Sequence, residues 1–125
     1  MWAEILPNKC PPEDAVTPLN LVYYRMVDSI PPTEIDFASQ RALHPAKFFK
    51  DIDECVARST SLFDSCNGCK SARDRRDGLK HKKIIEIKLS HDSGVIKNTF
   101  RQGHYSWWRF KEYDVSIHSR IADYE

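Results

Sequence analysis

The stretch KIIEIKL, residues 83–89, is the clearest strand pattern in the chain. Ile85, Ile87 and Leu89 lie on one side of such a strand, and the charged residues between them lie on the other side. This alternation is typical of a strand that buries one face and turns the other toward water. The sequence therefore predicts a half-buried strand here.

Outward from this stretch, four further segments have the composition of strands. They are rich in β-branched or aromatic residues, or alternate in polarity, and turn residues bound them. These predicted strands are residues 19–27, 56–63, 95–99 and 113–118.

Three segments have helical patterns. The first is predicted from Thr33 to about Leu43, because Thr33 and Asp36 have the spacing of a capping box. The second is a loose pattern over residues 46–55, and the third runs from a cap at Asp64-Ser65 to near Gly78.

Helices are expected early in the domain and strands late. That order favours an α+β fold, a single small domain with a mostly antiparallel sheet and two or three helices, over a doubly wound parallel sheet. The chain has 125 residues, which fits one domain. Residues 1–18 carry four prolines and are predicted to form an extended arm, and residues 19–125 form the domain.

Composition limits the cellular setting. The formal net charge is +1, so overall charge gives no reason to expect a nucleic acid or a membrane surface as partner. No apolar run approaches the roughly 20 residues that span a bilayer, and the first residues lack the pattern of a secretion signal. We therefore expect a cytoplasmic protein without a membrane segment, and we interpret its four cysteines as thiols.

Cys66 and Cys69 form a Cys-x-x-Cys pair, a spacing used by zinc sites and redox motifs. A structural zinc site needs a second close ligand pair, which the sequence lacks. A redox pair is typical of a βαβ setting, which the sequence lacks as well. We therefore predict no metal site.

Arg25 lies inside the predicted strand 19–27. An arginine in a strand needs a charge partner, a sheet edge or a ligand, and its planar fork of donors suits a phosphate. The alternative is an exposed position or a structural ion pair.

Residues 59–61 read Ser-Thr-Ser on the predicted strand 56–63. Ser59 and Ser61 share one face, and Thr60 lies on the other. Their hydroxyls can orient a carboxylate or a ligand, or they can form an ordinary polar strand end.

Glu112 and Asp114 share one face of the predicted last strand. Two carboxylates this close raise the pKa of one of them, which suits a general base. The alternative is a solvated outer face.

An arginine on an early strand, Ser-Thr-Ser on a middle strand and paired acids on a late strand, in this order, resemble the ADP-ribosyltransferase family in its arginine–serine–glutamate branch. The resemblance covers roughly residues 19–118 and implies an ADP-ribosyltransferase-like fold that uses NAD as its substrate. It implies that Arg25 binds the NAD phosphates and that Ser59 orients the catalytic acid, with Thr60 and Ser61 in support.

The same resemblance makes Asp114 the catalytic acid and gives Glu112 the place of the residue that engages the acceptor. Asp114 stands where the family has glutamate, so its side chain is one methylene shorter. The implied activity is transfer of ADP-ribose to a macromolecular acceptor, or cleavage of NAD, by an intracellular toxin or modifier.

Residues 104–111 interleave aromatic and basic side chains. Under the resemblance, Tyr105 or Trp107 would stack on the nicotinamide ring and His104 would hydrogen-bond a ribose.

The alternative hypothesis is a non-enzymatic module that binds a protein partner or single-stranded nucleic acid. It would use Trp107, Trp108 and the basic stretch 70–83, because exposed aromatic faces beside cations hold unpaired bases at about 1–3 kcal/mol per stacked base. Nucleic acid is the less favoured of these partners, because the sequence contains no recognised DNA- or RNA-binding signature.

Overall fold

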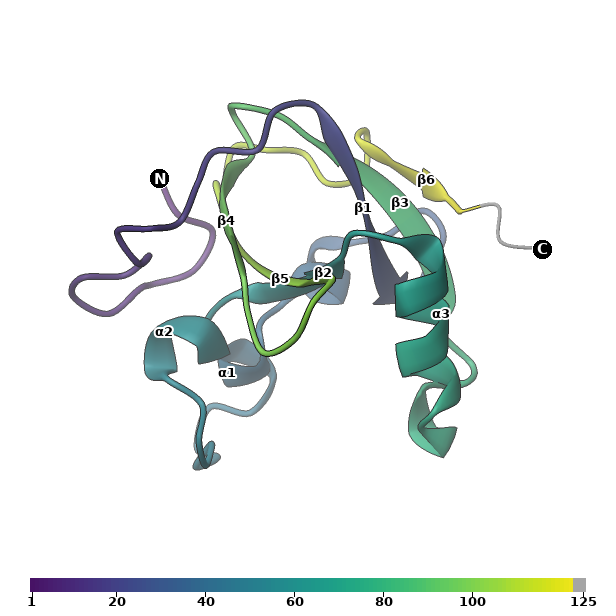
Figure 1. Cartoon of the computed structure of the whole chain (residues 1–125), viewed down its shortest axis with the longest axis horizontal. Coiled ribbons are helices and arrows are strands. Elements are labelled where there is room, and N and C mark those ends of the chain that lie inside the picture. Colours follow the sequence, from purple (N-terminus) through teal and green to yellow (C-terminus); the bar gives the residue numbers. More distant parts are fainter. Residues whose placement is uncertain (123–125) are drawn as a thin grey trace.

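Six strands form one antiparallel sheet in the computed structural model, which describes residues 1–122 (Figure 1). The spatial order of the strands is β4-β5-β2-β1-β3-β6, and each neighbouring pair is antiparallel. Their bounds are β1 Leu21–Val27, β2 Thr60–Phe63, β3 Lys83–Leu89, β4 Gly94–Asn98, β5 His104–Arg109 and β6 Ser119–Ile121.

The helices are short, and most of them precede the late strands. Their bounds are η1 Glu34–Phe37, α1 Gln40–Leu43, α2 Glu54–Ala57, α3 Cys66–Asp74 and η2 Asp77–Leu79, where η marks a 3-10 helix. None of the helices within residues 1–122 is long and apolar enough to cross a membrane. These helices and the single antiparallel sheet confirm the predicted α+β class with a mostly antiparallel sheet.

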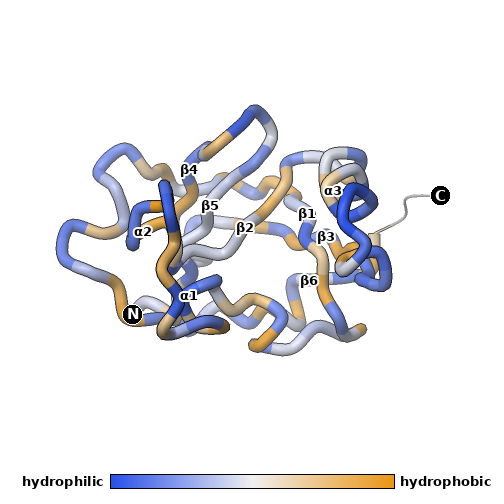
Figure 2. The backbone as a smooth tube through the Cα atoms, turned by 90° about the horizontal axis from the view of Figure 1, so that it is seen from below, coloured by the Kyte–Doolittle hydropathy of each residue, from blue (hydrophilic) through white to orange (hydrophobic). Residues whose placement is uncertain are grey.

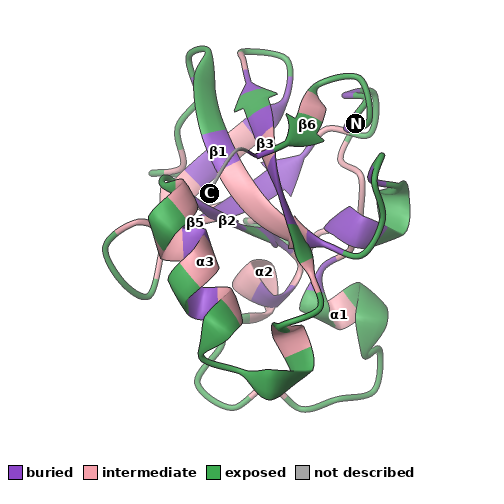
Figure 3. Cartoon of the chain, turned by 90° about the vertical axis from the view of Figure 1, so that its right-hand side faces the viewer, coloured by how far each residue is buried: buried purple, intermediate pink, exposed green. Residues whose placement is uncertain are grey.

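The sheet has a different set of apolar side chains on each face. The larger core lies on the face of Tyr23, Val27, Ile85, Ile87 and Trp107, and all five are nearly or fully buried. The opposite face packs under α3, where Phe63, Cys69 and Ile84 form a second cluster. Figure 3 shows α3 lying against the sheet with an exposed outer side, and Figure 2 shows that much of α3 is hydrophilic.

Strand prediction is correct for residues 83–89, which form β3, and wrong for residues 113–118. Those residues form turns, because the Asp114 carboxylate accepts hydrogen bonds from the backbone N–H and hydroxyl of Ser116. The last strand follows instead as β6. Residues 104–109, described from sequence only as aromatic, form β5.

The predicted helix from Thr33 to Leu43 is interrupted. The Asp36 carboxylate does accept from the Thr33 N–H, as the capping pattern predicts. Ala38 is extended, with φ −63° and ψ 142°, and Ser39 then caps a separate helix, α1. The predicted helix 46–55 shortens to α2, which also occupies the start of the predicted strand 56–63.

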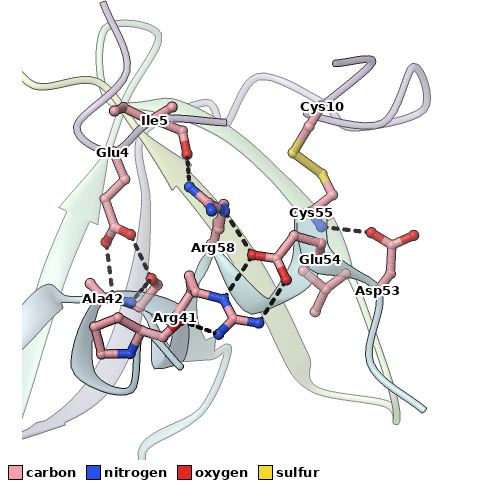
Figure 4. A network of polar contacts seen from close by, with 12 residues as sticks. Glu4, Ile5, Cys10, Arg41, Ala42, Asp53, Glu54, Cys55 and Arg58 are labelled. Carbon is pink, nitrogen blue, oxygen red and sulfur yellow. Dashed lines mark hydrogen bonds and ion pairs between the residues drawn. A yellow bond between two sulfur atoms is a disulfide. The ribbon is translucent and has the colours of Figure 1, made fainter. Parts of the chain in front are cut away.

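The N-terminal arm is fastened to the domain by a disulfide and by polar contacts (Figure 4). Cys10 is bonded to Cys55 in α2, so the prediction that all four cysteines are thiols is wrong for this pair. The Glu4 carboxylate accepts from the Ser39 N–H and hydroxyl, at 2.9 and 2.5 Å. A structural disulfide is more typical of oxidising compartments, and the cytoplasmic location stays a prediction.

Glu54 connects α1 and α2. Its carboxylate accepts two hydrogen bonds from Arg41, both at 2.9 Å, and one from Arg58 at 2.8 Å (Figure 4). The hydrogen bonds from Arg41, and next the one from Arg58, lower the pKa of Glu54 to about 2. Arg58 also donates to the carbonyl of Ile5, so the same cluster holds the arm.

Replacing Cys10 and Cys55 by serine is expected to lower the free energy of unfolding by about 2–4 kcal/mol, because the bond closes a loop across 45 positions. Urea unfolding followed by tryptophan fluorescence measures the change. Dithiothreitol should destabilise the wild type by a similar amount and leave the double variant unchanged. Equal midpoints for oxidised and reduced wild type would contradict this role of the disulfide.

Candidate functional site

The sheet opens between β1 and β2. β1 is paired with β3 along all seven of its residues, but with β2 only at Tyr24 and Phe63. Next to that single pair, Arg25 bridges the opening: its Nη1 donates to the Ser61 carbonyl at 2.7 Å and its Nε donates to the Asp36 carbonyl at 2.8 Å. The guanidinium thus joins β1, β2 and η1 where ladder hydrogen bonds would otherwise continue.

Arg25 carries a charge that no carboxylate within ion-pair distance balances, as far as residues 1–122 are described. Both of its hydrogen bonds go to neutral carbonyls, and its Nη2 has no hydrogen-bond partner in that part of the chain. Burial, and next the nearby Arg109, lower the pKa of Arg25 to about 10, so the group stays protonated at pH 7. A cation in this setting favours an anionic ligand.

Arg25 lines a cleft with a volume of about 670 Å³. This volume falls within the range of roughly 300–1,000 Å³ that is usual for small-molecule sites. The walls come from β1, β2, α3, the segment around α1 and the turn before β5. No carboxylate is among the lining residues that the structure describes, and five are cations: Arg25, Arg75, Arg76, Lys82 and Arg101.

The other cations differ in how firmly they are held. Arg101 is exposed and lies over the Phe63 ring, 5.7 Å from its centroid. Lys82 is partly buried and pairs with Asp28 at 3.1 Å, so part of its charge is already balanced. Arg75 and Arg76 are exposed at the end of α3 and beyond it, on the rim of the cleft.

Two of the predicted hydroxyls reach the cleft. Ser59 and Ser61 both line it, as expected for residues two apart on one face. Ser59 is 7% exposed and donates to the Val56 carbonyl at 2.7 Å, which leaves its oxygen able to accept. Thr60 is on the other face, buried, and donates to the Phe37 carbonyl at 2.6 Å, so it acts in packing.

His104 begins β5 and lines the same cleft. It is 5% exposed, and its ring lies between the rings of Phe63 and Phe100, each 5.4 Å away between centroids. Its Nδ1 is 3.2 Å from the Thr99 carbonyl oxygen. Burial is the largest cause that lowers its pKa, so the imidazole is neutral at pH 7.

Neither predicted acid lines this cleft. Asp114 is exposed in a turn, and the hydrogen bonds from Ser116 hold its pKa below the usual range. Glu112 accepts from the amino group of Met1 at 3.1 Å, and that contact lowers its pKa. The expectation that close approach raises one of these pKa values is therefore wrong, because each carboxylate has its own donor.

The aromatic residues of β5 are core residues rather than walls of the cleft. Trp107 is 0% exposed and Trp108 is 1% exposed, and their indole N–H groups donate to the carbonyls of Ser93 and Cys55. Tyr105 packs edge-on against Tyr23. Trp107 and Tyr105 therefore lie away from the cleft lining, and the two tryptophans offer no exposed face for stacking on bases.

The sequence predicts that Arg25, Ser59, Ser61 and His104 share one site, and all four line the cleft. It does not predict that the other cations of the lining belong to the same site. The sequence-based alternative places the stretch 70–83 on a surface for a protein partner or single-stranded nucleic acid. The sequence predicts the cap at Ser65 that starts α3, and Arg75 and Arg76 follow the last residue of this helix at the rim. The position of Arg101 had no local signal.

Comparison with known protein families, with curated proteins and with solved structures finds no match to this chain.

Trp107→Ala is expected to cost about 3–5 kcal/mol of unfolding free energy, because it removes a fully buried side chain from the larger core. Phe48, at 84% exposed, is the matched aromatic control, and Phe48→Ala should change stability by less than about 0.5 kcal/mol. Chemical denaturation monitored by circular dichroism measures both. Similar stability of the two variants would show that Trp107 is not a core residue.

Proposed function

We propose that the chain is an ADP-ribosyltransferase-like domain that binds NAD in the cleft between β1 and β2. In this proposal it transfers the ADP-ribosyl group to a macromolecular acceptor or to water. The observation that carries the proposal is the Arg25 guanidinium, which lines the cleft without a carboxylate within ion-pair distance in the described chain.

Charge and shape support a dinucleotide diphosphate as the ligand. The pyrophosphate of NAD carries negative charge on oxygens that accept hydrogen bonds, which suits Arg25 and Arg101. Apolar side chains of Met26, Leu43 and Leu79 also line the cleft and offer surface to the rings of the ligand. A mixed lining of apolar groups and a few placed polar groups is the usual composition of a cofactor site.

The proposal departs from the sequence-based scheme at the catalytic acid. Arg25 keeps the expected role of phosphate binding, and Ser59 and Ser61 offer hydroxyl groups to the ligand instead of orienting a catalytic acid. Asp114 and Glu112 are assigned no role in the cleft, because neither lines it.

The non-enzymatic alternative has less support. Its stacking surface would be Trp107 and Trp108, which are buried, and three cations of its basic stretch, Arg75, Arg76 and Lys82, line the cleft. A single-stranded nucleic acid that used these three cations would occupy the same cleft, and NAD would compete with it.

Arg25→Gln is expected to weaken NAD binding by about ten- to hundredfold, because a charge-assisted hydrogen bond contributes about 1.5–3 kcal/mol. Isothermal titration calorimetry at low ionic strength measures the affinity, which should fall as salt is added. The matched control is Arg120→Gln, since Arg120 is 82% exposed on β6 and pairs with Glu86.

Arg25 also joins three elements, so a second variant separates binding from folding. Arg101 is exposed, and Arg101→Ala should leave the unfolding midpoint unchanged and weaken NAD severalfold. Wild-type protein that fails to bind millimolar NAD, yet binds a labelled oligonucleotide in an Arg25-dependent way, would refute the proposal in favour of the alternative.

A further inference from the structure

His104 is placed where a proton acceptor would meet a ligand in the cleft. It stands opposite Phe63 in the pairing of β5 with β2, on the face where Ser61 also lies. The rings of Phe63 and Phe100 flank it and shield it from bulk water. The position is thus buried on two sides and open to the cleft.

His104 contacts Thr99 through Nδ1. Nδ1 is 3.2 Å from the Thr99 carbonyl oxygen, which can only accept, and this contact favours the tautomer with the proton on Nδ1. The Thr99 hydroxyl is 3.1 Å from the same nitrogen and 2.9 Å from the Ser106 hydroxyl. These contacts hold the ring through Nδ1, and in the tautomer that donates to the Thr99 carbonyl, Nε2 carries the lone pair.

Nε2 is not fully buried. In residues 1–122 the structure gives this nitrogen no hydrogen-bond partner, and none of the fully buried side-chain nitrogens or oxygens described there lacks a partner. It follows that Nε2 is accessible. Since His104 lines the cleft, Nε2 is the imidazole atom available to a bound molecule.

The charged groups around the ring favour its neutral form. Arg25 on β1 and Arg101 before β5 add to burial in lowering the pKa of His104, and the Thr99 carbonyl partly opposes them. Asp64, whose backbone N–H donates to the Gly103 carbonyl, is the acidic residue next to this turn. At pH 7 the lone pair on Nε2 is therefore free to accept a proton.

Among the described residues that line the cleft, His104 is the one neutral base. The other polar side chains of the described lining are arginines, a lysine, serines and Gln40, and none is a neutral base at pH 7. The carboxylates of Asp114 and Glu112 lie outside the lining and are bound by local donors.

We propose that His104, rather than Asp114 or Glu112, is the general base of the cleft. This inference rests on the proposed use of NAD. The oxygen of a water or acceptor hydroxyl forms a bond to C1′ of the nicotinamide ribose, and Nε2 takes the proton of that hydroxyl or water. The C1′–N bond breaks, and its electron pair passes to the nicotinamide nitrogen, which loses its positive charge. The proton then leaves Nε2 for solvent, and the products are nicotinamide and an ADP-ribosyl compound.

The test variant is His104→Asn, because the asparagine amide keeps a donor near the Thr99 carbonyl and removes the base at Nε2. His91→Asn is the matched control, since His91 is exposed in the turn between β3 and β4. NAD affinity is measured by calorimetry and nicotinamide release by chromatography. We expect His104→Asn to bind NAD within about threefold of wild type and to release nicotinamide about 10²–10⁴ times more slowly.

Two further measurements do not depend on that rate alone. The wild-type rate at saturating NAD should fall as the pH is lowered through the pKa of His104, and His91→Asn should keep that profile. Nitrogen chemical shifts of the free protein, obtained by NMR at pH 7, should show His104 protonated at Nδ1 and unprotonated at Nε2.

The outcomes separate this inference from the proposed function. If NAD binds and His104→Asn releases nicotinamide as fast as wild type, His104 is not the base, while NAD binding stands. If wild type binds NAD but never cleaves it, His104 is not a general base. The same holds if NMR shows His104 protonated at Nε2. If Asp114→Asn no longer releases nicotinamide, the role of general base returns to Asp114. No binding of NAD at all overturns both proposals together.

Discussion

The pair of hydrogen bonds from Arg25 to the carbonyls of Asp36 and Ser61 is the contact on which the site depends. It closes the polar gap that opens when β2 leaves β1 after one paired position. Backbone carbonyls left unpaired at such a gap would be costly, and a guanidinium can satisfy two of them at once. The same contacts bring η1 and β2 to the positions from which the cleft is built.

The constraint has an electrostatic consequence. By strand alternation Arg25 shares a face with Tyr23 and Val27, both core residues, so a cation occupies what would otherwise be a core position. The Phe37 ring, 5.8 Å away, and two carbonyls stabilise it, but none of these carries a negative charge. Arg25 is half-buried, and the nearby Asp36 carboxylate favours its charged form without forming an ion pair with it, so a bound anion would stabilise the charge further.

The sequence predicted correctly those elements that neighbouring residues specify by themselves. KIIEIKL became β3 because alternation alone determines which side chains are buried, and the Thr33–Asp36 pattern formed as expected. Asp114 was misplaced for an equally local reason: an aspartate two residues before a serine can bind that serine's N–H and end a strand pattern. The Cys10–Cys55 bond joins residues 45 positions apart, and no pattern marks the pairing.

The candidate site was predictable only in part, because its position depends on contacts between distant residues. Arg25, Ser59, Ser61 and His104 stood out by residue type, whereas their common cleft depends on where β1 and β2 separate. That separation depends on a side chain bonding to distant carbonyls, which strand propensity does not register. The hypothesis that Trp107 and Trp108 form a stacking surface is wrong, because interleaved aromatic and basic residues occur in a buried strand as well as on an exposed surface.

In the proposed mechanism, Arg25 and Arg101 would link ligand binding to the chemistry of His104. Their charges help to keep the imidazole neutral. A pyrophosphate bound beside them would balance those charges, and the pKa of His104 would then rise toward its ordinary value. A base with a higher pKa accepts a proton more readily, so His104 would become a stronger base when the anion is in place. Under the proposed function, a cleft whose lining within residues 1–122 contains no carboxylate would attract a phosphate and still hold a proton acceptor, because that acceptor is a histidine whose basicity the ligand would increase.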